Sequence, residues 1–290
     1  MQKIKRYQAL YANRKLSSKY PNLEHLGSSY KKKQQEKRLS RKNSGNYKPD
    51  SKKIIIECFF RLADLNNLSK RALDIGCGPT PTFVKELIES GLDAKGIEPV
   101  DEMCRSAQDF LSDESRIIKG HAEKIPVPDN SQSFVVLNSV LEHVTSPILT
   151  LNEIYRVLEP GGVAYISTTN RYMFHNSEYI KRFFQWYPAI LKESYVFMHL
   201  HYQPKLANYS SRPAVHWFSY SDLCKLGRYA GFFSFYSPID LVLDGDIPKG
   251  GFQGVLTKHL FQHCKYNPLL RSLVLTFTGV GGTIFMVKER

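Results

Sequence analysis

Residues 73–78 (Leu-Asp-Ile-Gly-Cys-Gly) constrain the fold of this chain more than any other stretch. They end a short apolar run and precede a segment whose apolar residues have helical spacing. An apolar run that breaks into Gly-x-Gly before a helix is typical of the first strand–turn–helix unit of a nucleotide-binding α/β fold. Gly76 and Gly78 would let the backbone turn tightly and a ligand come close. Pro81 replaces the third glycine of a dinucleotide fingerprint, which favours a ligand with an adenosine but no pyrophosphate.

An acid stands at the end of the next predicted strand. Residues 93–98 are predicted to form this strand, which ends in Glu98, 20 positions after Gly78. Doubly wound folds place a carboxylate there to hold two ribose hydroxyls. The alternative is an exposed acid at a strand end, but the spacing favours cofactor binding.

Four further stretches follow in order: 96–99 (Gly-Ile-Glu-Pro), 120–126, 140–144 and 153–162. Together with residues 74–78 they resemble the motifs of the class I S-adenosylmethionine (SAM) dependent methyltransferases of the small-molecule type. The resemblance implies a Rossmann-like α/β fold with helices on both faces of a seven-stranded, mostly parallel sheet whose last strand is antiparallel. It also implies an enzyme with SAM as its cofactor.

The resemblance assigns the cofactor site to particular positions. His121 stands where the family commonly has an aspartate, and an unprotonated ring nitrogen of His121 could still accept a hydrogen bond from the adenine amino group. The end of the strand at 134–138 should face the methionine part of SAM. The predicted cofactor-binding residues are Asp74, Gly76, Cys77, Gly78, Glu98, Pro99, Met103, His121, Ala122, Glu123, Asn138 and Ser139.

His143 follows that strand and has two interpretations. It packs near the cofactor, or it is a catalytic general base that removes a proton from an acceptor hydroxyl. Some relatives that methylate hydroxyls bind a divalent metal through Glu-x-x-Glu-His on this segment. Ser139 occupies the first of these positions here, so we predict no metal.

The acceptor is expected at residues 168–172 (Thr-Thr-Asn-Arg-Tyr), which resemble a Pro-Asn-Arg segment of the family with Thr169 in place of the proline. An aromatic-rich insertion, 172–215, follows, and insertions at this point cover the active site. His199 and His201 lack a clear third ligand, so lining of a pocket is favoured over metal binding. The predicted substrate-binding residues are Asn170, Arg171, Trp186, His199, His201 and His216.

The excess positive charge is confined to the N-terminus. The chain has a net charge of +13, and residues 1–53 alone carry 16 Lys and Arg against 3 Asp and Glu. Such a segment cannot bury enough apolar surface to fold alone. Residues 1–50 are therefore a solvated basic extension, or an arm for an anionic partner, either nucleic acid or an acidic membrane surface.

The remaining residues, 51–290, are predicted to form one methyltransferase domain with insertions at 172–215 and 243–270. Within it we expect a strand over 232–239 and a helix over 255–264. Residues 268–287 are predicted as an apolar helix, a glycine turn and a final strand, with no transmembrane span. Five scattered cysteines without a Cys-x-x-Cys pair, and no apolar signal sequence, favour a cytoplasmic location, with peripheral membrane contact as an addition.

The sequence thus predicts methyl transfer from SAM to an oxygen, with nitrogen or carbon as secondary alternatives, of a non-protein acceptor of a small-molecule, glycan or lipid type, as a biosynthetic step. The strand at 134–138 lacks an Asn/Asp-Pro-Pro-Tyr motif, which disfavours methylation of base amino groups. Two alternatives remain: an RNA methyltransferase that uses the basic extension, and a binding module of the same fold that has lost catalysis.

Overall fold

The structure is a computed structural model that describes residues 51–64, 66–173, 186–188, 191, 214, 216–243 and 251–290. The basic extension 1–50 lies outside the described residues, and so does most of the insertion 172–215, including His199 and His201. Expectations about these segments stay predictions.

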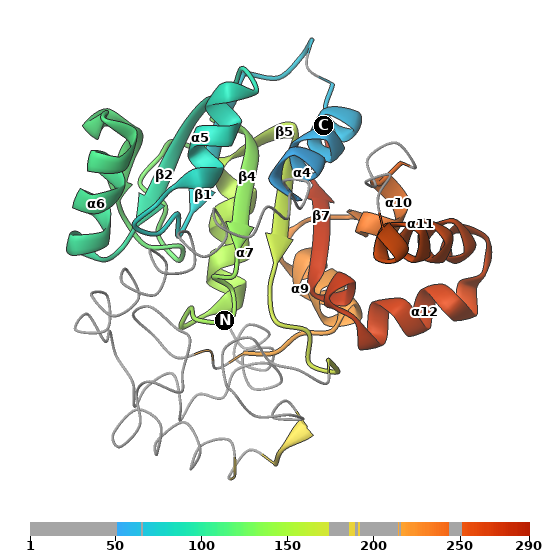
Figure 1. The fold of residues 1–290 in the computed structure, drawn as a ribbon. Helices are drawn as coiled ribbons and strands as arrows, with labels where there is room; N and C mark the ends of the chain where they lie inside the picture. The colour runs from blue at the N-terminus through green and yellow to red at the C-terminus, as the bar shows by residue number, and fades with distance from the viewer. Residues whose placement is uncertain are drawn as a thin grey trace.

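Seven strands form one sheet in the order β3-β2-β1-β4-β5-β7-β6 (Figure 1). Neighbouring strands from β3 to β5 are parallel, and β7 is antiparallel to both β5 and β6. This confirms the predicted class I fold. The strands are β1 (Arg71–Ile75), β2 (Asp93–Glu98), β3 (Ile117–Lys119), β4 (Gln132–Asn138), β5 (Leu158–Ser167), β6 (Ser234–Tyr236) and β7 (Thr283–Val287).

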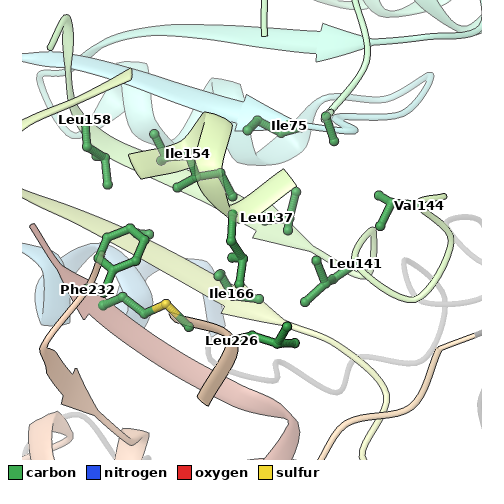
Figure 2. Close-up of a cluster of buried hydrophobic side chains, with 14 of the residues drawn as sticks. Ile75, Leu137, Leu141, Val144, Ile154, Leu158, Ile166, Leu226 and Phe232 are labelled. Atoms are coloured by element: carbon green, nitrogen blue, oxygen red, sulfur yellow. The ribbon is translucent and has the colours of Figure 1, made fainter. Parts of the chain in front are cut away.

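Apolar layers cover both faces of the sheet. Successive side chains of a strand point to opposite faces, so a buried central strand needs cover on each side. In β4, Leu137 packs with Ile154 and Leu226 from α7 and α9 (Figure 2), whereas Phe134 and Val136 pack with α4 and α5. The helices are α4 (Ser51–Leu62), α5 (Thr82–Glu89), α6 (Asp101–Leu111), α7 (Pro147–Val157), α9 (Tyr220–Ala230), α10 (Pro238–Leu241), α11 (Gly251–Tyr266) and α12 (Pro268–Phe277).

The helix ends follow the local sequence. Ser219 precedes α9 and accepts a hydrogen bond from the Asp222 amide, while the Asp222 carboxylate accepts one from the Ser219 amide. This reciprocal pair is a capping box, which satisfies amides that have no partner inside the helix. Gly91 follows α5 at φ +87°, a left-handed conformation that ends a helix at little cost for glycine.

The chain after α9 differs from the prediction in one place. A strand was expected over 232–239, but β6 ends at Tyr236 and residues 238–241 form α10. Ser237 caps this short helix and Pro238 occupies its first turn. Because these two residues together favour a helix start, they end the strand early. The helix expected over 255–264 is longer and forms α11.

Residues 268–287 form a helix, a glycine turn and a strand, as predicted: α12, the 3-10 turn η6 (Gly279–Gly282) and β7. Figure 1 shows α11 and α12 beside each other on the β7 side of the sheet. Among the helices that the structure describes, none combines the length and the apolar character needed to cross a membrane.

Candidate active site

The turn after β1 contains two glycines in the left-handed region, Gly76 at φ +72° and Gly78 at φ +67°. A Cβ atom on Gly76 would lie 2.4 Å from Cγ2 of Val140, so Gly76 is required for packing against the segment after β4. A Cβ atom on Gly78 would meet no atom within 4 Å. Gly78 therefore borders open space at the carboxyl end of β1, where doubly wound folds bind their ligands.

Glu98 faces this turn from the end of β2. Its Oε2 accepts a hydrogen bond from the Gly78 amide at 3.0 Å, and its Oε1 accepts one from the Val100 amide at 3.1 Å. Burial raises the pKa of Glu98 to about 7, although the two amides act in the opposite direction. A carboxylate oxygen that accepts one hydrogen bond retains a second lone pair. The arrangement can thus accept two further hydrogen bonds from a pair of hydroxyls.

Asp74 is buried in β1 beside Glu98. Burial, and secondly the charge of Glu98, raise the pKa of Asp74 to about 8. Within the described part of the chain, its carboxylate has no hydrogen-bond partner. Burial of a carboxyl group is unfavourable unless a donor forms a hydrogen bond with it. Two neighbouring buried acids with raised pKa values, such as Asp74 and Glu98, are typical of a binding site. These residues fit the adenosine and amino-acid parts of SAM.

Three further predicted cofactor residues surround this crevice. Cys77 is half-buried, and a Cβ atom on Gly96 of β2 would lie only 2.7 Å from its Sγ. Burial raises the pKa of the Cys77 thiol well above its usual value, so the thiol is neutral. Pro99 is half-buried, and Met103 is buried in the first turn of α6. Their contacts with the cofactor stay predictions.

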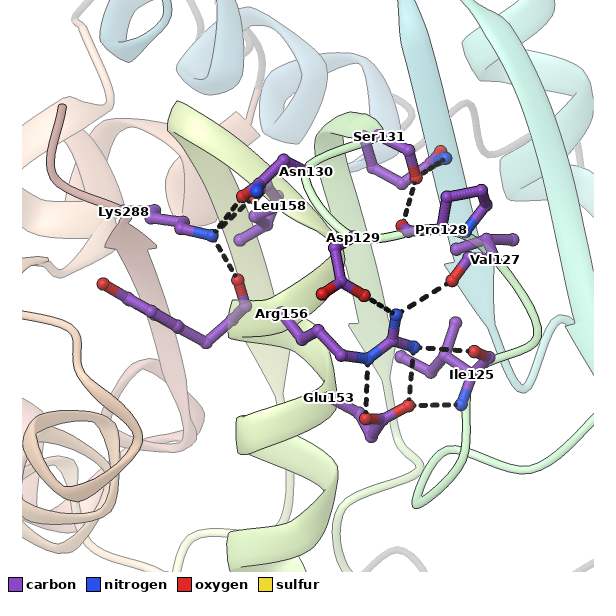
Figure 3. Close-up of polar contacts among 12 residues, drawn as sticks. Ile125, Val127, Pro128, Asp129, Asn130, Ser131, Glu153, Arg156, Leu158 and Lys288 are labelled. Carbon is purple, nitrogen blue, oxygen red and sulfur yellow. Dashed lines mark hydrogen bonds and ion pairs between the residues drawn. The ribbon is translucent and has the colours of Figure 1, made fainter.

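A charge network holds the loop at residues 120–126 (Figure 3). Arg156 on α7 donates to both carboxylate oxygens of Glu153 and to the main-chain carbonyls of Ile125 and Val127. Glu153 in turn accepts a hydrogen bond from the Ile125 amide at 2.8 Å. Hydrogen bonds from Arg156 hold the pKa of Glu153 below its usual value, so the pair stays charged. The network fixes the loop that is predicted to contact adenine.

Within this loop, Glu123 connects the segments that follow β3 and β4. Its Oε1 accepts a hydrogen bond from the Thr145 amide at 2.7 Å. Ala122 is buried, whereas His121 is exposed. Glu123 thus has a structural contact of its own, and the predicted roles of His121, Ala122 and Glu123 in binding adenine stay predictions.

The end of β4 is exposed and strained. Asn138 and Ser139 are both exposed, and Ser139 has φ +58°. Its amide donates to the Ser167 carbonyl at the end of β5, at 2.8 Å. A left-handed conformation costs a non-glycine residue about 1–2 kcal/mol, and such residues cluster at functional sites. The observation supports the prediction that Asn138 and Ser139 face the cofactor.

Glu142, at the second glutamate position of the Glu-x-x-Glu-His pattern, is a candidate site residue that was not among the predicted ones. It is buried, its Oε2 accepts a hydrogen bond from Thr168 Oγ1 at 2.7 Å, and burial raises its pKa to about 7. Neighbouring His143 is half-buried, and its amide donates to the Val140 carbonyl. The available signal was its place in that pattern, four positions after the end of β4. Glu142 therefore places a titratable carboxyl group next to His143, the predicted base.

Asn170 was predicted to bind the acceptor, but its side chain is buried and bonded within the protein. Its Nδ2 donates to the carbonyls of Thr276 at 2.9 Å and Thr278 at 2.7 Å, and its Oδ1 accepts from the Tyr172 amide. Asn170 therefore fastens the end of α12 to the end of β5. Both protons of the Asn170 side-chain amide already have acceptors within the protein, which favours a structural role for this residue.

The other predicted acceptor residues have different surroundings. His216 is fully buried, and its Nε2 lies 2.8 Å from the Val144 carbonyl, which also favours a structural role. Arg171 Nη1 lies 3.2 Å from Oδ2 of Asp222. Trp186 is exposed. Their contacts with an acceptor stay predictions.

A cavity of about 530 Å³ lies between the first turn of α9 and α12. It is close to the carboxyl end of β5, because Tyr172 lines it and Asp222, another lining residue, pairs with Arg171. Its walls are rich in hydroxyls and contain two cations. They are formed by Tyr172, Ser219, Tyr220, Ser221, Asp222, Lys225, Pro268, Arg271, Ser272, Leu275 and Thr276.

Comparison with known proteins supports the assignment of the fold. Residues 73–166 match a family model described as a methyltransferase domain. An uncharacterized methyltransferase of Schizosaccharomyces pombe is 35% identical over 105 residues, which cover 32% of this chain and 37% of that protein. A demethylmenaquinone methyltransferase of a Geobacillus species is 28% identical over 99 residues, covering 32% and 42%. The matches span about two fifths of these relatives.

A solved structure of a SAM-dependent methyltransferase from Thermotoga maritima is 23% identical, with a TM-score of 0.40 over 63% of this chain and 73% of that one. The sheet order and the family match carry the assignment. The fold is that of the class I methyltransferases, residues 73–166 match a methyltransferase domain, and SAM is the cofactor expected of such a domain.

Proposed function

We propose that this chain transfers the methyl group of SAM to an oxygen of a non-protein acceptor, of a small-molecule, glycan or lipid type. The observation that carries the proposal is the pairing of Glu98 with the Gly78 amide across an open turn. This pairing supports binding of an adenosine whose two ribose hydroxyls donate to the carboxylate. The family match over residues 73–166 supports transfer of a methyl group.

The cofactor would be held by residues of three strand ends. Gly76 and Gly78 would give it room, Glu98 would bind its ribose, and Asp74 would accept from its polar groups. The loop of His121, Ala122 and Glu123 would contact the adenine, and Asn138 with Ser139 the methionine part. When bound, SAM supplies a methyl group that its sulfonium has already activated. The protein must then position the acceptor and remove its proton.

His143 is the residue that we propose as the base. A neutral imidazole within hydrogen-bond reach of the acceptor hydroxyl would take up the proton that this oxygen loses. Glu142, beside it, has a pKa raised to about 7 and is held by Thr168. In the part of the chain that the structure describes, no three His, Cys, Asp or Glu side chains form a group that could hold a metal ion.

Two other functions differ from this proposal in what they bind. An RNA methyltransferase would use the basic residues 1–50, and its affinity for RNA would fall steeply with salt because phosphate contacts release counterions. A binding module of the same fold would bind SAM and transfer nothing. The cytoplasm is the proposed location of all three.

The test is methyl transfer from methyl-labelled SAM to three separate pools: polar small molecules, extracted lipids and glycolipids, and RNA. We expect label in one of the first two pools, and its loss with the His143→Ala variant. Label in RNA would favour the first alternative. Binding of SAM without label in any pool would favour the binding module.

A further inference from the structure

α12 presents three different faces around its axis. At about 3.6 residues per turn, positions four apart lie on one face. One face lines the cavity beside α9, with Arg271, Ser272 and Thr276. A second face, with Leu270 and Val274, packs into a small core with α11. The third face neither lines this cavity nor belongs to this small core.

This third face is an exposed apolar stripe formed by Leu269, Leu273 and Phe277, which are 72%, 48% and 40% exposed. Tyr266, the last residue of α11, is 89% exposed and lies two positions before α12 begins. A row of large apolar side chains on one helix marks an interaction surface. On the helix, the stripe adjoins the face that lines the cavity, so one ligand could contact both.

The charge around this stripe is positive. Among the described residues, Lys265 near the end of α11 and Arg271 on α12 are the cations next to it in the chain. Two acids lie nearby on other elements, and each is already paired: Asp222 with Arg171 and Asp240 with Arg271. Lys225 in the cavity wall is exposed, and no ion pair or hydrogen bond is described for it. Once these pairs are set aside, Lys225 and Lys265 are the described cations that remain near the stripe, and their charge complements an anionic partner.

We propose that the stripe and the cavity together dock the protein on an anionic phospholipid bilayer. Leu269, Leu273 and Phe277 lie among the acyl chains, and the cavity takes a lipid phosphate at Lys225, beside the hydroxyls of Ser221 and Ser272. An apolar helix face bordered by cations and a tyrosine is typical of interfacial helices. An anionic bilayer requires both features at one surface, an apolar row and cations that no acid neutralises.

The position of α12 connects this surface with the proposed active site. Asn170 binds the end of α12, and Thr283, which begins β7, pairs with Ser167 at the carboxyl end of β5. A docked bilayer would thus lie near the carboxyl end of β5, at the edge of the sheet where the parallel strand β2 ends in Glu98. Docking itself does not depend on methyl transfer.

The test is flotation of the full chain with phosphatidylcholine vesicles that contain or lack phosphatidylserine. We expect Leu269→Ser and Leu273→Ser each to lower the partition coefficient about tenfold, because each removes an inserted leucine. Lys225→Gln should lower it about fivefold on the anionic vesicles only. Phe233→Ser is the matched control, since Phe233 is 63% exposed but precedes the start of β6, which pairs with the end of β7 and not with its start beside the carboxyl end of β5.

Protection of residues 266–277 from hydrogen exchange by anionic vesicles gives a second readout. If the leucine variants float like the wild type, or if no vesicle binds, the proposal is wrong. The first of these results would place membrane binding in another segment, such as residues 1–50. Neither result bears on SAM binding, so failure of docking and failure of the proposed methyl transfer can be told apart.

Discussion

The carboxylate of Glu142 and the hydroxyl of Thr168 lie 2.7 Å apart and join the segments that follow β4 and β5. The same region carries a second connection, since the Glu142 carbonyl accepts a hydrogen bond from the His216 amide. Three pieces of chain that are far apart in the sequence therefore share one buried acid. They are the pieces that should border the acceptor.

The first prediction concerns this pair. Thr168→Val removes the donor and leaves a buried carboxyl without its partner, so we expect a loss of about 1–3 kcal/mol in the free energy of unfolding. Thr168→Ser keeps the hydroxyl and should lose much less. Urea denaturation of both variants measures the difference, and equal losses would contradict the role of the hydrogen bond.

The second prediction concerns pH. Burial raises the pKa of Glu142 from 4.5 to about 7, so the native protein holds a proton that the unfolded chain releases. Stability from this group is complete below the unfolded pKa and is lost as pH rises through the native one, by up to about 3 kcal/mol. Glu142→Gln should therefore become more stable relative to the wild type between about pH 5 and pH 8. A difference that stays constant with pH would refute this assignment.

The third prediction uses three glycines with positive φ. Gly78→Ala should cost about 1–2 kcal/mol of stability from backbone strain and lower SAM affinity at least tenfold, because its Cβ enters the open space. Gly91→Ala carries similar strain with equal room, but it lies at the end of α5 and should leave affinity unchanged. Gly76→Ala should destabilise most, since its Cβ meets Val140.

Thermal unfolding and calorimetry with SAM measure both effects for each glycine variant. Equal affinities of the Gly78→Ala and Gly91→Ala proteins would mean that the ligand does not approach Gly78.

The sequence was sufficient for the sheet and for the crevice. Few folds other than a doubly wound one explain Gly76 and Gly78 followed by Glu98, 20 positions after Gly78. The geometry of the turn and the spacing of the strands determine where these residues meet. The apolar run of β4 likewise predicted a strand covered on both faces. Such local patterns can be predicted from the sequence because each depends on residues that are close together in the chain.

Other parts of the site depend on contacts between distant segments. Asn170 was expected at the acceptor because of its place after β5, but carbonyls about a hundred positions later, at the end of α12, bind its amide. His216 is similar, since Val144 lies 72 positions before it. Glu142 was left out of the predicted site because its burial, which raises its pKa, and its hydrogen bond from Thr168 both depend on distant segments, which a short motif does not show.

The fourth prediction tests the structural role of Asn170. Asn170→Ala leaves the carbonyls of Thr276 and Thr278 without their donor and should cost about 2 kcal/mol of stability. Hydrogen exchange at the end of α12 should become faster in this variant. Asn170→Asp has a carboxylate that cannot donate to these carbonyls, so it should show the same faster exchange. If hydrogen exchange is unchanged in both variants, the structural role is wrong and Asn170 is again a candidate for binding the acceptor.

The most direct test of the central claim, SAM binding at Gly78 and Glu98, is titration calorimetry with SAM and with its demethylated product. We expect micromolar binding of both by the wild type and at least tenfold weaker binding by Glu98→Ala, because the carboxylate holds the ribose. Absence of binding in a well-folded wild-type sample would contradict the account, as would equal affinities of the two proteins.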